Sequence, residues 1–96
     1  MTQSDLTGIS IKDMFDAGLH FGHQTKRWNP KMKGYIFDKR NGIHIIDLTQ
    51  SVELLDEAAK FVRETVLAGK KILFVATKKQ LSEVIKSSAE DADQFY

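Results

Sequence analysis

The side chains best suited to binding chemistry are concentrated between Gly18 and Leu48. This stretch holds six lysines and arginines, all three histidines, the only tryptophan and the only proline of the chain. Asp38 and Asp47 alone oppose these cations, and the whole chain carries a net charge of +1, so the positive charge is local. Basic side chains interleaved with aromatic rings can neutralise phosphates and stack on bases. The stretch therefore indicates a surface for nucleic acid.

The candidate RNA-binding residues are Lys26, Arg27, Trp28, Asn29, Lys31, Lys33, Lys39, Arg40, Lys78 and Lys79. Four of these cations lie within eight residues and repel one another unless anions are near, which favours phosphate contacts. Trp28 has two interpretations, a ring that plugs the loop onto the core or a ring that stacks on a base or ribose. Arg40 precedes the Asn41-Gly42 turn, where it either reaches a phosphate or is solvated.

The histidines are candidates for RNA contacts or for structural roles. His20 and His23 form an H-x-x-H pair, but a metal site needs three or four ligands and nothing nearby completes one, so we expect no metal. His44 lies between Ile43 and Ile45 in a strand pattern and should point to the opposite, polar face. No paired carboxylates or nucleophile–base set indicates a reaction, so we expect neither catalysis nor a cofactor.

Lys78 and Lys79 come directly after Thr77, which follows the apolar run Ile72–Ala76. In open α/β sheets, anionic ligands dock at the carboxyl end of a strand and at the next helix N-terminus. The segment has no glycine, so neither dinucleotide-binding nor P-loop spacing is present. An α/β enzyme domain that binds a phosphorylated ligand at Thr77-Lys79 remains an alternative, as does a protein–protein interaction module.

The helices and strands that must position these side chains are predicted from the spacing of apolar residues and from helix-capping residues. Ser10 and Asp13 form a capping box for a short helix, and residues 20–34 read as an irregular basic segment. Strands are expected at 35–37 and 43–48 around the Asn41-Gly42 turn. A helix over 52–68 should be capped by Thr49 or Ser51, with Glu53, Asp56, Glu57 and Glu64 on its solvated face.

The remaining elements complete the predicted fold class. The run Ile72–Ala76 should be a strand covered on both faces, and Thr77 with Gln80 should cap a helix to about residue 89 that turns Leu81, Val84 and Ile85 inward. Strand and helix then alternate as in a parallel α/β sheet. We predict a flexible tail over 1–9, then a short helix, a basic loop, and part of a flavodoxin-like or Rossmann-like layer. Two full strands leave apolar surface uncovered, so we expect a fragment of a longer domain or a chain that needs a partner.

The composition and the N-terminal sequence narrow the class of protein further. The chain has 96 residues and no cysteine, which excludes disulfides and thiolate metal sites and fits a reducing cytoplasm. The polar N-terminus has no signal-peptide or transit-peptide pattern, and no apolar run approaches the ~20 residues that a membrane span needs. These features predict a small soluble protein without a membrane partner.

The order of the residues adds a family resemblance. HFGHQTKRWNPKM, the later NGIHIIDL, GKKILFVATKKQ and the final DQFY closely resemble the N-terminal part of the small-subunit ribosomal protein S-two family, bacterial type. The resemblance implies that residues 10–96 are the N-terminal portion of a truncated α/β domain that binds small-subunit rRNA. It also implies a structural role in translation, at the ribosome of a bacterium or organelle, and contact with ribosomal protein S-one.

Overall fold

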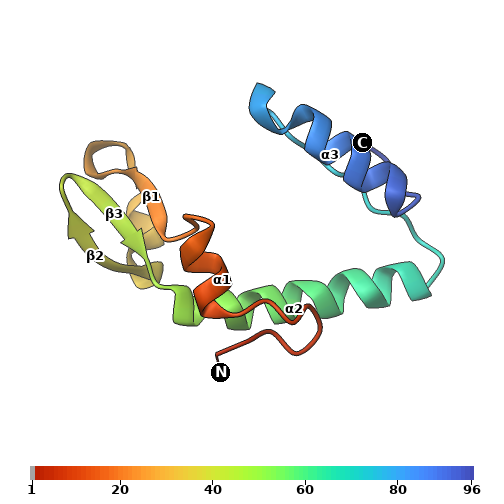
Figure 1. Cartoon of the computed structure of the whole chain (residues 1–96), viewed down its shortest axis with the longest axis horizontal. Coiled ribbons are helices and arrows are strands. Elements are labelled where there is room, and N and C mark those ends of the chain that lie inside the picture. The colour runs from red at the N-terminus through yellow and green to blue at the C-terminus, as the bar shows by residue number, and fades with distance from the viewer. Residues whose placement is uncertain (1) are drawn as a thin grey trace. The chain divides into compact units, whose positions relative to one another are not determined.

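The computed structural model describes residues 2–96, and the chain divides into two compact units, Met1–Ala59 and Lys60–Tyr96. Figure 1 shows the elements of the first unit, the helix α1 (Ile11–Asp16) and the strands β1 (Phe21–Gln24), β2 (Ile36–Arg40) and β3 (Ile43–Ile46). The long helix α2 (Leu48–Leu67) begins in this unit. Each unit is described by itself below.

The capping box predicted for α1 is confirmed. The backbone N–H of Asp13 donates to the Ser10 hydroxyl at 3.0 Å, and the backbone N–H of Ser10 donates back to the Asp13 carboxylate at 2.9 Å. The second of these bonds is the main cause that lowers the pKa of Asp13, with the Ser10 side chain next. Two otherwise unpaired N–H groups are thereby satisfied at the start of the helix.

The three strands form one antiparallel sheet in the order β1-β3-β2. The predicted hairpin is confirmed, since β2 and β3 pair directly across Asn41 and Gly42. These two residues have positive φ angles of 52° and 74°. A two-residue turn of this hand matches the right-handed twist of the flanking strands, and Asn-Gly is the sequence that adopts it most readily.

Strand β1 was not predicted, because residues 20–34 read as irregular throughout. Gly22 explains how this strand can approach: a Cβ atom here would lie only 3.2 Å from the carbonyl oxygen of His44. Without that atom, the β1 backbone comes close enough to pair with the free edge of β3. The β1 pairing places β3 in the centre of the sheet, with both edges occupied.

Helix α2 begins four residues earlier than predicted, because Asp47 caps it in place of Thr49 or Ser51. The Asp47 carboxylate accepts hydrogen bonds from the hydroxyl and the N–H of Thr49, at 2.6 and 3.1 Å. The Thr49 hydroxyl, followed by the Gln50 side chain, lowers the pKa of Asp47. The early start brings Leu48 into the core of the first unit with Met14 and Val52, and half-buried Ile11 and Leu55 pack against them.

Asp56 was predicted on the solvated face of this helix, and that prediction is wrong. Only 5% of its surface is exposed, and its carboxylate accepts hydrogen bonds of 3.1 Å from the Ser4 hydroxyl and from the Leu6 N–H. Ser4 is itself 1% exposed. A buried carboxylate requires such donors, since burial without partners is costly. Part of the segment predicted as a flexible tail, residues 2–9, is thus bonded to α2.

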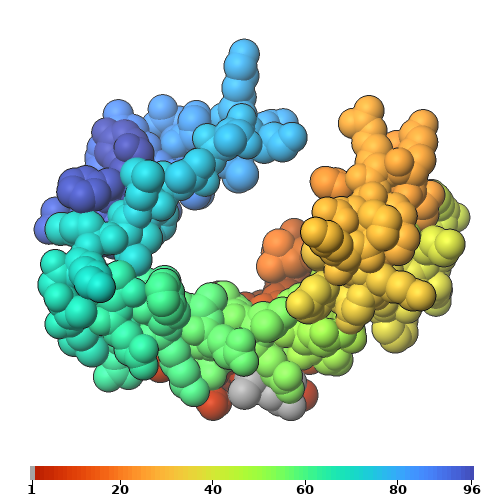
Figure 2. All heavy atoms as spheres, turned by 180° about the vertical axis from the view of Figure 1, so that it is seen from behind, coloured from red at the N-terminus to blue at the C-terminus, as the bar shows by residue number. Residues whose placement is uncertain are grey.

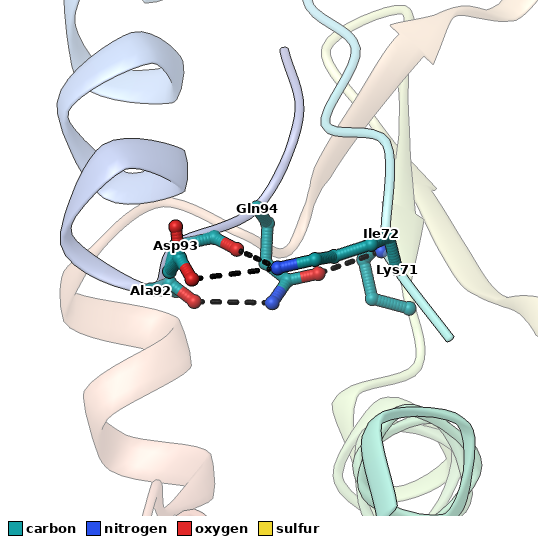
Figure 3. A network of polar contacts seen from close by, with 5 residues as sticks. All are labelled: Lys71, Ile72, Ala92, Asp93 and Gln94. Atoms are coloured by element: carbon teal, nitrogen blue, oxygen red, sulfur yellow. Dashed lines mark hydrogen bonds and ion pairs between the residues drawn. The ribbon is translucent and has the colours of Figure 1, made fainter. Parts of the chain in front are cut away.

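The second unit contains a 3-10 turn, η3 (Lys79–Leu81), and the helix α3 (Ser82–Asp91). Figure 3 shows the contacts near the end of α3: Lys71 Nζ donates to the Asp93 carbonyl at 2.8 Å, and Gln94 accepts from the Ile72 N–H at 2.7 Å. Beside these bonds, Leu73 and Phe95 form one parallel β-bridge. The chain segments before and after α3 therefore run side by side.

Two predictions for this unit are wrong. The run Ile72–Ala76 is not a covered strand: Phe95 is its one bridge partner among the described residues, and Leu73 and Val75 are 63% and 70% exposed. β-branched residues favour a strand, but a ladder needs a neighbouring strand of matching length. Thr77 and Gln80 form no capping box, because a 3-10 turn precedes α3 and neither start has a side-chain cap.

The inward faces predicted for the helices are only partly buried. Leu81 at the end of η3 and Val84 in α3 are 46% and 57% exposed, while Ile85 is half-buried and Ala89 is fully buried. The chain is thus α/β in composition, with an antiparallel sheet in its first unit. The described residues contain a single parallel bridge and no parallel sheet.

Candidate nucleic-acid interface

The basic loop, residues 25–35, is built from two 3-10 helices, η1 (Thr25–Arg27) and η2 (Pro30–Tyr35). Asn29 begins η2, where its Oδ1 accepts a hydrogen bond of 3.0 Å from the Lys31 N–H. Pro30 occupies the first turn of η2, a position where the missing N–H costs nothing. Asn29 therefore has a structural role as a cap.

All six cations of the loop and the adjacent hairpin are exposed. They are Lys26, Arg27, Lys31, Lys33, Lys39 and Arg40. Figure 2 shows long side chains of the orange segment extending away from the body of the first unit. Tight 3-10 turns hold the backbone that carries four of these cations, Lys26 and Arg27 in η1 and Lys31 and Lys33 in η2.

One carboxylate lies among these cations. Asp38 accepts hydrogen bonds from the Lys39 N–H at 2.7 Å and from Arg40 Nε at 3.1 Å. The Lys39 backbone bond, followed by the Arg40 side chain, lowers the pKa of Asp38. Arg40 is thus offset by a neighbour, whereas the other five cations make no ion pair within residues 2–96.

Trp28 lies against the sheet in the first unit. Its ring meets the His44 ring edge to face, with centroids 4.5 Å apart and an interplanar angle of 62°. Trp28 is half-buried, so part of the ring covers the sheet and part stays accessible. His44 is only 3% exposed, which corrects the prediction of a polar-face histidine. The strand alternation does not reveal that Trp28 covers this face.

Two hollows adjoin one another around Trp28, Ile36 and His44, which line both. The first has a volume of about 450 Å³ and is otherwise lined by Phe21, Gly22, His23, Asn29, Met32 and Ile46. The second, of about 380 Å³, is otherwise lined by Thr25, Lys33, Phe37, Asp38 and Lys39. An apolar hollow and a charged hollow thus share the Trp28–His44 ring pair in their linings.

Comparison with known protein sequences shows the family of this chain. Residues 14–96 match the family model described as Ribosomal protein S2. The chain belongs to the ribosomal protein S2 family. It is 56% identical over its whole length to the small ribosomal subunit protein uS2 of Roseiflexus sp. (strain RS-1), and equally to that of Roseiflexus castenholzii (strain DSM 13941 / HLO8). The chain spans 37% and 36% of the length of these two relatives.

His20 and His23 take different environments in this S2-family chain. The His20 ring stacks on Phe15 and lies tilted against Phe21, with centroids 4.3 and 4.1 Å apart, while His23 lies exposed in β1. Among residues 2–96, no three histidine or acidic side chains are grouped closely enough to hold a metal ion. The first histidine therefore contributes to packing, and the second lines the apolar hollow.

Lys78 and Lys79 of this S2-family chain belong to the second unit. Both are exposed at the start of η3, and Lys78 makes no capping hydrogen bond through its side chain. Two charges here add to the positive potential of the second unit. In the described part of the chain, no helix has the length and apolar content to cross a membrane.

Two features that shape the surface were not predicted, the close backbone approach at Gly22 and the burial of His44. Gly22 admits β1 to the sheet, and His44 underlies Trp28. The signal for Gly22 was available, since a glycine inside a strand pattern often marks a close backbone approach. The buried state of His44 had no such signal, because it depends on where the basic loop folds back.

Proposed function

We propose that this chain is the N-terminal part of a structural constituent of the small ribosomal subunit and binds rRNA through its basic loop. The observation that carries the proposal is the exposure of five cations without ion-pair partners in the described residues, in a chain that belongs to the ribosomal protein S2 family. Lysine and arginine side chains in this state release counterions when they meet phosphates.

The proposed contacts divide by chemistry. Lys26, Arg27, Lys31 and Lys33 meet the sugar–phosphate backbone from the loop, and Lys39 and Arg40 extend the contact along the hairpin. Contacts of this kind recognise the shape of folded RNA more than its sequence. Lys78 and Lys79 supply a further, separate phosphate contact.

We also infer a longer α/β domain of which residues 10–96 are the first portion, preceded by a tail over 1–9. The support is the Leu73–Phe95 bridge, because two parallel segments joined by a helix are the repeating unit of a flavodoxin-like or Rossmann-like sheet. Further parallel strands would cover the exposed side chains of Leu73 and Val75. The length of the relatives leaves room for such strands.

The role is structural in this proposal, with no reaction and no cofactor. Partners are small-subunit rRNA and neighbouring ribosomal proteins, among them ribosomal protein S-one, in the cytoplasm of a bacterium or in an organelle. The support for a protein partner is the exposed apolar surface of the second unit, where Val84 and Phe95 are 57% and 59% exposed.

Filter binding of the chain to folded small-subunit rRNA tests this proposal. We expect saturable binding that competing transfer RNA displaces less well than unlabelled rRNA. The melting temperature should not change when millimolar ATP, GTP or NAD is added. A saturable shift that is lost when Lys78 and Lys79 are changed to Ala, without rRNA binding, would replace the structural role by a phosphorylated-ligand enzyme.

A further inference from the structure

The two hollows around Trp28 differ in the chemistry of their walls. The first is lined mainly by apolar groups, among them Phe21, Met32 and Ile46, and its volume of about 450 Å³ lies in the range of about 300 to 1,000 Å³ usual for small-ligand pockets. Asn29 and His23 also line it and offer polar groups to an aromatic ligand with a polar edge.

The second hollow carries the charge. Lys33 and Lys39 line it with Thr25, and all three offer hydrogen-bond donors to an anion. Asp38 also lines this hollow, but its carboxylate is occupied by the Lys39 N–H and by Arg40 Nε. With Arg40 offsetting Asp38, the two lysines give this hollow a net positive charge.

His44 joins the two hollows and carries an unmet hydrogen-bonding group. It is 3% exposed, and its Nδ1 atom has no hydrogen-bond partner among the described residues. Buried polar atoms in native proteins nearly always have a partner. His20 Nδ1 is orphaned in the same way, but of the two residues only His44 lines both of these hollows, so a ligand group held there can supply its missing partner. A flip of the imidazole ring exchanges the positions of Nδ1 and Cδ2, so the nitrogen can lie on either side of the ring.

We propose that these hollows hold one unpaired nucleotide of RNA. The base enters the apolar hollow against Trp28 and bonds to His44, and its phosphate lies between Lys33 and Lys39. This inference rests on the proposed function and adds a base-binding site to the phosphate contacts. An aromatic side chain of a peptide would fill the apolar hollow equally well but would bring no anion to the two lysines.

The test uses Trp28 as its own reporter, because it is the only tryptophan in the chain. The whole chain is titrated with an eight-residue oligoadenylate and with an abasic ribose-phosphate oligomer of the same length, and binding is followed in parallel by the anisotropy of a label. We expect both to bind at low salt, with saturable quenching of tryptophan fluorescence by oligoadenylate alone. Its affinity should exceed that of the abasic oligomer about tenfold, as for one base stacked on an aromatic side chain.

Two matched variants locate the effect. His44→Phe keeps a ring beneath Trp28 but removes its nitrogens, so it should lower the affinity for oligoadenylate about threefold through the lost hydrogen bond, while binding the abasic oligomer unchanged. His20→Phe makes the same change at a histidine that lines neither hollow, and should leave the affinity for oligoadenylate unchanged. Should His44→Phe fail to fold, Met32→Ala at the exposed rim replaces it and should weaken oligoadenylate binding several-fold.

The outcomes separate the two proposals. Equal binding and equal quenching by both oligomers would overturn the nucleotide site and leave the phosphate contacts intact. Stronger quenching by a phenylalanine-rich peptide than by oligoadenylate would assign the hollow to a protein partner. Absence of binding by either oligomer and by rRNA would remove the proposed function itself.

Discussion

Removal of four charges from the basic loop should change how RNA affinity depends on salt. The variant combines Lys26→Ala, Arg27→Ala, Lys31→Ala and Lys33→Ala. All four side chains are exposed and make no ion pair within the described residues, so their loss breaks no contact that stabilises the fold. The effect should therefore appear in RNA binding and leave the melting temperature nearly unchanged.

The magnitude follows from the number of free cations. Five cations without ion pairs, these four and Lys39, can meet five phosphates. These five contacts contribute about −3.5 to the slope of log affinity against log salt on single-stranded RNA and about −4.5 on duplex. Through these contacts, affinity should fall about 130- to 500-fold between about 50 and 200 mM salt. The variant loses four of these contacts, so its slope should be smaller in magnitude than that of the parent by about 2.8 on single-stranded RNA and by about 3.6 on duplex.

Filter binding to small-subunit rRNA over this salt range measures both slopes. The matched control removes the same number of charges outside the loop and the hairpin, at Lys12, Arg63, Lys70 and Lys86, all of which are exposed. We expect the control to keep the parent slope. The reasoning would be refuted if the loop variant kept the slope of the parent while the control variant had a flatter slope. That result would place the phosphate contacts on other elements.

Three further outcomes concern the fold. Asp56→Ala leaves two donors of residues 2–9 unpaired, so the free energy of unfolding measured in urea should fall by about 1 to 3 kcal/mol. An alanine substitution at an exposed position of the same helix should lower it by less than about 0.5 kcal/mol. Gly22→Ala puts a Cβ 3.2 Å from a β3 carbonyl and should cost about 1 to 3 kcal/mol by the same measurement, whereas Gly34→Ala, with open space around it, should be close to neutral; equal costs would contradict the close approach. The Thr49 hydroxyl lowers the pKa of Asp47 below its ordinary 3.8, so the stability that this cap contributes is fully present above that pH and is lost as pH falls through the lower native value. Asp47→Asn should keep the helix content at neutral pH by circular dichroism and remove this part of the acid dependence, and an unchanged acid profile would exclude Asp47 as its source.

The parts of the fold that the sequence predicted are set by adjacent residues. The Ser10–Asp13 capping box and the Asn41-Gly42 turn need only a few neighbouring side chains in the right order, so their chemistry can be read directly. Strand β1 and the buried carboxylate of Asp56 depend on partners 19 or more residues away. Residue spacing alone does not tell which distant segment will supply them.

The same distinction applies to the candidate site. The exposure of the loop cations was predictable, since clustered like charges avoid burial. The contact between Trp28 and His44 was not, because strand alternation assigns a residue to a face without showing what covers it. For Trp28, the two interpretations left open by the sequence were not exclusive: the ring both covers the sheet and remains half-accessible.

The bond between Ser4 and Asp56 has a consequence for the time course of folding during synthesis. These residues are 52 positions apart, so at about 5 to 20 residues per second the acceptor is made roughly 3 to 10 s after the donor. The β2–β3 hairpin needs only 11 consecutive residues, from Ile36 to Ile46, and such hairpins form within about 1 to 10 µs. The strands can therefore pair while residues 2–9 still wait for α2, and the part of the chain that is made first is among the last of its unit to be fixed in place.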